Sequence, residues 1–110
     1  MKALLIPTTG AVGEVEQHGL RDLQRLLHGD VEGLPVDGRH DVAAYVNEHG
    51  LLDGLPDNPR AMQLLGIPIA GAAVLCGFDP ATGEQTPIPD DLAKALLAIS
   101  TSTPGPAPEN

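Results

Sequence analysis

The chain has 110 residues, of which 42% are apolar and only two are aromatic, and its formal net charge at pH 7 is −9. A chain of this size buries roughly two-thirds of its unfolded surface, so we expect one domain with an aliphatic core. Six basic residues against fifteen acidic ones argue against direct nucleic-acid binding, which depends on Lys and Arg displacing counterions. No stretch has the ~18 apolar residues of a membrane span, and a single cysteine excludes an internal disulfide, so a cytoplasmic protein is expected.

The first thirty residues predict two short strands and a helix. The apolar run of residues 3–6 and the valines beyond a Thr-Thr-Gly turn are typical of paired strands. Residues 18–29 have the periodicity of an amphipathic helix, and Gly29 stands where a C-cap glycine belongs. The inward stripe of this helix is predicted to hold Leu20, Leu23 and Leu27.

A hairpin is predicted next in the chain. Asp37-Gly38 is a strong two-residue turn signal between the extended runs 31–36 and 39–46. Pro35 has no N–H to donate to a ladder, so the first of these runs is expected at a sheet edge.

The second half of the chain predicts a strand between two helices. Asn58 is a good N-cap, Pro59 fits the first helical position, and Gly66 ends that helix. The apolar run 69–78 predicts a strong strand. Residues 89–100 predict the last helix, with acidic residues at its N-terminus and with Leu92, Leu96 and Ile99 facing inward.

These elements predict an α+β fold, with a single small mixed or antiparallel sheet and two or three packed helices. Residues 1–100 form one domain in this interpretation. Residues 101–110 have no apolar periodicity and are predicted to be a disordered tail.

No set of residues in the sequence assembles catalytic or metal chemistry. Cys76 lies within the apolar run AAVLCGF, where a small buried hydrophobe is expected rather than a nucleophile. The four histidines have no second ligand at helical i+4 spacing, and phosphate-binding and dinucleotide-binding glycine motifs are missing. We therefore expect a protein that is not an enzyme and that uses neither a metal nor a cofactor.

The stretch YVNEHGLLDGLPDNPRAMQL carries the most specific pattern of the chain. It places an Asn-Glu-x-Gly turn before Gly-Leu-Pro-x-Asn and then an alanine, at Asn47, Glu48, Gly50, Gly54, Leu55, Pro56, Asn58 and Ala61. In this order the pattern resembles an uncharacterised small domain family encoded by actinobacteria, their conjugative plasmids and their phages. The resemblance covers residues 1–79 and implies a genomic setting but no activity. His49 departs from the family, which often has an acidic or other polar residue at this place.

This stretch allows two interpretations. In the first, its residues shape turns and caps, and Asn58→Ala costs roughly 1 kcal/mol through the lost cap. In the second, polar side chains converge on one cleft that recognises a peptide or a small polar molecule. The candidate binding residues are then Tyr45, Asn47, Glu48, Asn58 and Arg60.

Three functions follow from these observations. The leading one is a small acidic protein that binds a protein partner through an apolar or acidic patch away from the hairpin, as an accessory or modulator of a mobile element or its actinobacterial host. The second is a ligand-binding or sequestering domain with a polar cleft near Asn47 and Asn58, which a homo-oligomer interface could complete. The third is a DNA mimic, and scattered carboxylates would exclude it. It requires a spaced row of carboxylates such as Glu14, Glu16, Asp30, Glu32, Asp37 and Asp41.

Overall fold

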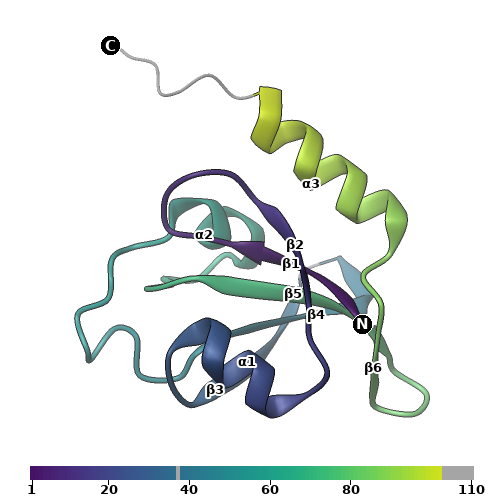
Figure 1. Cartoon of the computed structure of the whole chain (residues 1–110), viewed down its shortest axis with the longest axis horizontal. Coiled ribbons are helices and arrows are strands. Elements are labelled where there is room, and N and C mark those ends of the chain that lie inside the picture. Colours follow the sequence, from purple (N-terminus) through teal and green to yellow (C-terminus); the bar gives the residue numbers. More distant parts are fainter. Residues whose placement is uncertain (37, 103–110) are drawn as a thin grey trace.

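The computed structural model describes residues 1–36 and 38–102, with side chains to residue 98, as one sheet flanked by helices (Figure 1). Its elements in chain order are β1 (Lys2–Ile6), β2 (Gly13–Glu16), α1 (Leu20–Leu27), β3 (Val31–Val36), β4 (Arg39–Asn47), α2 (Pro59–Leu65), β5 (Ala73–Asp79), β6 (Glu84–Thr86) and α3 (Asp90–Ser102). The strand order is β2-β1-β5-β4-β3, and β6 pairs with β5 outside this order. Every pairing is antiparallel. The described residues therefore form an α+β fold with one six-stranded antiparallel sheet and three helices, which confirms the predicted fold class.

The central strand β5 is covered on both faces of the sheet. Val74 and Cys76 belong to the apolar cluster under α1, whereas Ala73 and Leu75 belong to the larger cluster on the side of α2 and α3. Figure 1 shows α1 on one side of the sheet and the other two helices on the opposite side. Successive side chains of a strand point to opposite faces, so a doubly covered strand must be apolar throughout. This explains the continuous apolar run in the sequence.

The β3–β4 hairpin forms with the predicted strands. Its register runs from Val31 opposite Asn47 to Pro35 opposite Ala43, with an irregularity after Pro35. β3 is the last strand at its side of the described sheet, as the missing N–H of Pro35 predicts. The predicted turn residue Asp37 lies outside the described residues.

Helix α1 differs from the prediction at both ends. Leu20 is 58% exposed and lies outside the buried cluster that holds Leu23, because it occupies the first turn of the helix, ahead of the covered stretch. The left-handed C-terminal residue is His28, with φ 64°, and not Gly29. The N–H of Gly29 still closes the helix end by donating to the Gln24 carbonyl oxygen at 3.1 Å.

The predicted strand 69–78 begins only at Ala73. Its first residues pair instead with the segment between β4 and α2, residues 48–58, which we call the strap. The N–H of Gly71 donates to the Pro56 oxygen at 2.7 Å, and the N–H of Asn58 donates to the Ile69 oxygen at 2.9 Å. Gly71 has φ 90°, a conformation that glycine adopts without strain, and it turns the chain out of this pairing and into β5.

The two remaining helices begin where the sequence predicts. Asn58 caps α2, and Pro59 occupies its first position. α3 carries Asp90 and Asp91 in its first turn, where carboxylates favour the helix dipole. Leu92 and Leu96 pack against the larger apolar cluster as expected. The side chain of Ile99 lies outside the described part of the chain, and so does the predicted tail apart from its first two residues, which end α3.

The strap packs closely on the segment before β5 at one glycine. A Cβ atom added at Gly50 would overlap the backbone oxygen of Ala70. We predict that Gly50→Ala lowers the free energy of unfolding by about 3 kcal/mol, because overpacking against backbone cannot be relieved by a rotamer change. Gly13→Ala is the matched control, since nothing lies within 4 Å of its added Cβ atom. Chemical denaturation measures both, and equal stabilities of the two variants would contradict the close contact.

Candidate functional site

Asn58 is a structural hub of the fold. It is fully buried, and its side-chain nitrogen donates to the Ile6 and Gly71 carbonyl oxygens, both at 3.0 Å. Its side-chain oxygen accepts from the Ala61 N–H at 3.1 Å, which caps α2. Both donors and the acceptor are thus occupied by backbone groups, so this side chain has no free polar hydrogen to offer a ligand.

Asn47 has a similar structural role at the end of α1. Only 8% of the residue is exposed, and its nitrogen donates to the Leu27 and His28 oxygens at 3.0 and 3.3 Å. Its side-chain oxygen accepts from the His49 N–H at 2.8 Å. These bonds satisfy the final carbonyls of α1, which explains how a non-glycine residue holds the left-handed position there.

Of the other three candidates, Glu48 lines the same groove as Asn47, whereas Tyr45 and Arg60 lie elsewhere. Tyr45 packs against the cluster under α1, Glu48 lies at the rim of that groove on the opposite face, and Arg60 donates to the Gly10 oxygen at 2.8 Å. The structure therefore does not bring the five candidates onto one polar cleft. The sequence left both interpretations of these residues open, because hydrogen bonds to carbonyls far along the chain have no local signal.

The carboxylates in the described part of the chain do not form the spaced row that a DNA mimic requires. Glu14 and Glu16 belong to β2 at one edge of the sheet, while Glu32 belongs to β3 at the other edge. Several acids are also paired within the chain: Glu16 lies 2.6 Å from the terminal amine, and Asp41 lies 2.8 Å from Arg39. These hydrogen bonds lower the pKa of both carboxyl groups. Asp37, the remaining turn carboxylate, lies outside the described residues.

A metal site and a reactive cysteine each make requirements on the described side chains. No three His, Cys, Asp or Glu side chains in the described part of the chain gather closely enough to hold a metal ion. Cys76 is fully buried, and this burial raises the pKa of its thiol to about 11, although the Gln17 amide donating at 3.4 Å opposes the shift. Such a thiol is almost entirely protonated at neutral pH and is a poor nucleophile.

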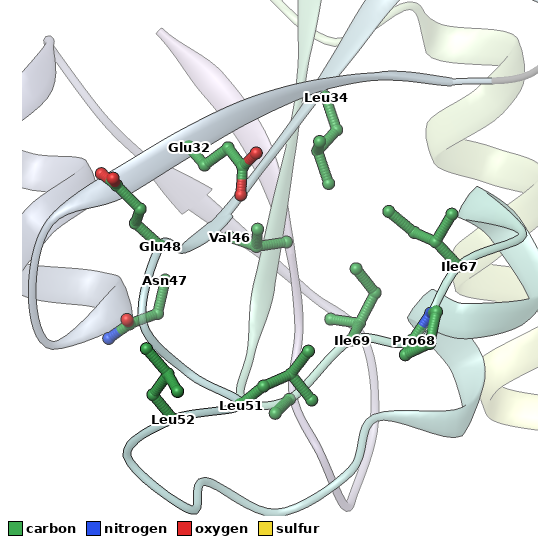
Figure 2. A pocket seen from close by; sticks show the side chains of 11 residues that line it. Glu32, Leu34, Val46, Asn47, Glu48, Leu51, Leu52, Ile67, Pro68 and Ile69 are labelled. Atoms are coloured by element: carbon green, nitrogen blue, oxygen red, sulfur yellow. The ribbon is translucent and has the colours of Figure 1, made fainter.

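The most distinctive surface is an apolar groove between the strap and the end of α2 (Figure 2). Its volume is about 450 Å³, and we call it the leucine groove. Figure 2 shows Leu51 and Leu52 of the strap facing Ile67 and Pro68 across the groove. Val46 and Ile69 lie between these walls, and Leu34 of β3 completes the groove at the edge of the sheet. Asn47 and Ala70 also line it.

The walls of the leucine groove are unusually exposed for apolar side chains. Leu52 is 86% exposed, Leu51 is 63% exposed and Ile67 is 44% exposed. Of the four large apolar side chains that the described residues leave exposed, three line this groove. Scattered surface leucines are ordinary, whereas a group of them around a hollow is the kind of surface at which interaction sites and ligand grooves occur.

The rim of the leucine groove is acidic. Glu32 and Glu48 line it, and no basic side chain in the described part of the chain does so. The patch lies beside the β3–β4 hairpin, whereas the sequence interpretation placed it elsewhere. One local signal marks it: two consecutive leucines stand in a strap that otherwise contains two glycines, two aspartates, one proline and one further leucine. Only the tertiary contacts decide that they remain exposed.

A family model described as a domain of unknown function (DUF3846) matches residues 1–100. The chain belongs to this family. No curated protein and no solved structure matches the chain. The DUF3846 family carries no assigned activity, so a function for this domain must be argued from its geometry.

None of the helices in the described residues of this DUF3846 domain is both long and apolar enough to cross a membrane.

Asn58 gives a direct test of the hub in this DUF3846 domain. Its replacement by alanine removes the cap and also the amide donor that bonds two buried carbonyls, so we predict a loss of about 3 kcal/mol in the free energy of unfolding. This exceeds the roughly 1 kcal/mol of a cap alone. Asn58→Ser keeps a capping oxygen and loses only the two donors, so its stability should lie between those of the wild type and Asn58→Ala. Equal stability of the wild type and Asn58→Ala in urea would show that the hydrogen bonds of Asn58 do not stabilise the fold.

The thiol of Cys76 gives a second test. Alkylation by iodoacetamide at pH 8 should be at least ~100-fold slower in the folded DUF3846 domain than in guanidinium, because burial and the raised pKa suppress the thiolate. The folded rate should keep rising with pH towards about 11, where the thiol titrates. A folded rate close to the unfolded rate would show an accessible, reactive thiol instead.

Proposed function

We propose that this protein is a small acidic binding module without catalytic activity, which recognises a partner protein at the leucine groove. The observation that carries this proposal is the gathering of Leu51, Leu52 and Ile67, all exposed, around one hollow. Covering a large aliphatic side chain is worth about 1.5–3 kcal/mol, so even two of them supply useful affinity. No comparable gain is available to a small polar ligand at Asn47 and Asn58, whose polar groups are already bonded.

The groove is suited to binding because its walls are held in place. The strap is bound to the segment before β5 by two backbone hydrogen bonds, at 2.7 and 2.9 Å, and by the side chain of Asn58. A pre-formed surface loses little conformational entropy when a partner docks, so more of the contact energy appears as affinity. This favours recognition of a partner by a rigid surface.

Charge selects the kind of partner that fits. Glu32 and Glu48 at the rim and a net charge of −9 favour an apolar segment that carries Lys or Arg. The same charges repel a second copy of this chain and nucleic acid. We propose a cytoplasmic role as an accessory or modulator protein of a mobile element or its actinobacterial host, a setting that rests on the resemblance of the Asn47–Ala61 pattern.

Leu52→Asp tests the proposed function. Because Leu52 is 86% exposed, its replacement should change the free energy of unfolding by less than about 0.5 kcal/mol. Affinity for the partner should fall at least tenfold, since the covered leucine is worth about 1.5–3 kcal/mol. The measurement is affinity capture from cells of the source organism with tagged wild type and variant, followed by titration of the protein that depends on Leu52.

Leu20→Asp is the matched control for this experiment. Leu20 is a comparably exposed leucine, 58%, but it belongs to α1 on the opposite side of the sheet. It should retain the partner, and retention should weaken in high salt. Identical sets of captured proteins for the wild type and Leu52→Asp would refute the groove as the binding surface. A dimer seen by sedimentation velocity that Leu52→Asp dissociates would refute a basic partner and identify the occupant as a second copy.

A further inference from the structure

We propose that the partner segment binds as an extended strand added to the open edge of β3, with its alternate side chains entering hollows on the two faces of the sheet. This deepens the proposed function, because it uses the leucine groove for one of those side chains. The edge of β3 lies directly beside the groove, since Glu32 and Leu34 of this strand both line it. The binding mode is β-strand addition, in which backbone hydrogen bonds give affinity and side-chain pockets give specificity.

The register of the hairpin shows which backbone groups of β3 are open. In an antiparallel pair, residues that exchange hydrogen bonds alternate with residues whose N–H and C=O point away from the partner strand. Glu48 donates its N–H to the Asp30 oxygen at 2.8 Å, so this position is hydrogen-bonded across the pair. By alternation, Glu32 also bonds to β4, whereas Val31 and Gly33 direct their backbone groups outward. These outward groups are the template for an added strand.

Pro35 fits the same alternation and limits the site. It occupies the next outward position after Gly33, where its missing N–H costs nothing to the β3–β4 ladder. An added strand would therefore find donors at Val31 and Gly33 but only an acceptor at Pro35. Because only two outward N–H groups precede Pro35, this edge can pair with a short peptide but not with a long strand.

A second hollow lies on the opposite face of the same edge. It has a volume of about 390 Å³, it is mostly apolar, and we call it the tyrosine hollow. Its lining includes Gly33 and Pro35 of β3 together with both aromatic side chains of the chain, Tyr45 and Phe78. Arg39 and His40 also line it, and Leu34 lines both hollows, so we expect the basic residue of the peptide on the side of the leucine groove. Gly33 and Tyr45 alternate along their strands with Leu34 and Val46, so the two pairs lie on opposite faces of the sheet. Tyr45 packs against the cluster under α1, whereas Leu34 and Val46 pack in the larger cluster on the side of the leucine groove.

Two hollows on opposite faces favour an extended occupant over a helical one. Side chains directly opposite each other in neighbouring strands point to the same face, so a residue opposite Leu34 would reach the leucine groove. The next residue of the peptide would reach the tyrosine hollow beside Gly33. A helix lying in the leucine groove would contact one face only. A Lys or Arg near these apolar side chains would pair with Glu32 or Glu48.

The test uses a phage-displayed library of random twelve-residue peptides selected on the full chain, followed by titration of synthetic binders. We expect enriched peptides that pair adjacent apolar residues with Lys or Arg and whose affinity falls at least tenfold for Leu52→Asp. Gly33→Pro removes an outward N–H while leaving the β4 ladder intact, so it should also weaken binding at least tenfold. Its added Cβ atom meets Tyr45 only at 3.4 Å, an ordinary contact. Leu20→Asp is the control and should bind as well as the wild type, because Leu20 lines neither hollow.

Amide hydrogen exchange on the wild-type chain supplies a readout that needs no variant to fold. The amides of Val31 and Gly33 should exchange rapidly in the free protein and become protected on peptide binding, while that of Glu32 is protected throughout. Binding that depends on Leu52 but leaves the Val31 and Gly33 amides unprotected would overturn strand addition and leave the proposed function standing. A library with no binder that depends on Leu52 would overturn both.

Discussion

The fold depends on the burial of one amide side chain, that of Asn58. Its three hydrogen bonds join the end of β1, the turn before β5 and the first turn of α2. These segments are distant in the sequence, and each has a buried backbone group that needs a hydrogen-bond partner. A neutral amide suits this position because it can donate twice and accept once without the cost of a buried charge.

This constraint reaches the surface through the strap. Asn58 and its neighbours fix residues 56–58 against residues 69–71, and this pairing holds one end of the strap beside the leucine groove. The Gly50 contact with Ala70 holds the other end of the strap in the same way. The residues that hold the strap in place are thus buried, while the residues proposed to contact a partner are exposed leucines. Stability and binding can therefore be altered separately.

Local sequence rules predicted much of the fold. The Asn58-Pro59 start of α2, the edge position of β3 and the acidic start of α3 each follow from the chemistry of one or two residues. The start of β5 could not be predicted in this way, because residues 69–72 are as apolar as a strand but pair with the strap.

The candidate site was predicted less well than the fold, for the same physical reason. Asn47 and Asn58 were identified as important residues, but the sequence could not reveal that their partners are carbonyls of Leu27, Ile6 and Gly71. Leu51 and Leu52 looked like ordinary apolar residues until the tertiary contacts showed that nothing in the described part of the chain covers them. Exposure is a property of the assembled surface, and short stretches of sequence contain little information about it.

Photo-cross-linking in living cells tests directly whether the leucine groove is the surface that binds the partner. Benzoylphenylalanine placed at position 52 would lie at the wall of the leucine groove, and the same residue at position 20 would lie on the exposed side of α1. If the partner binds at the leucine groove, position 52 should form an adduct with a partner segment that is apolar and carries Lys or Arg. Position 20 should form no such adduct. Adducts from position 20 alone, or a partner segment from position 52 that is acidic and polar, would contradict binding at this groove.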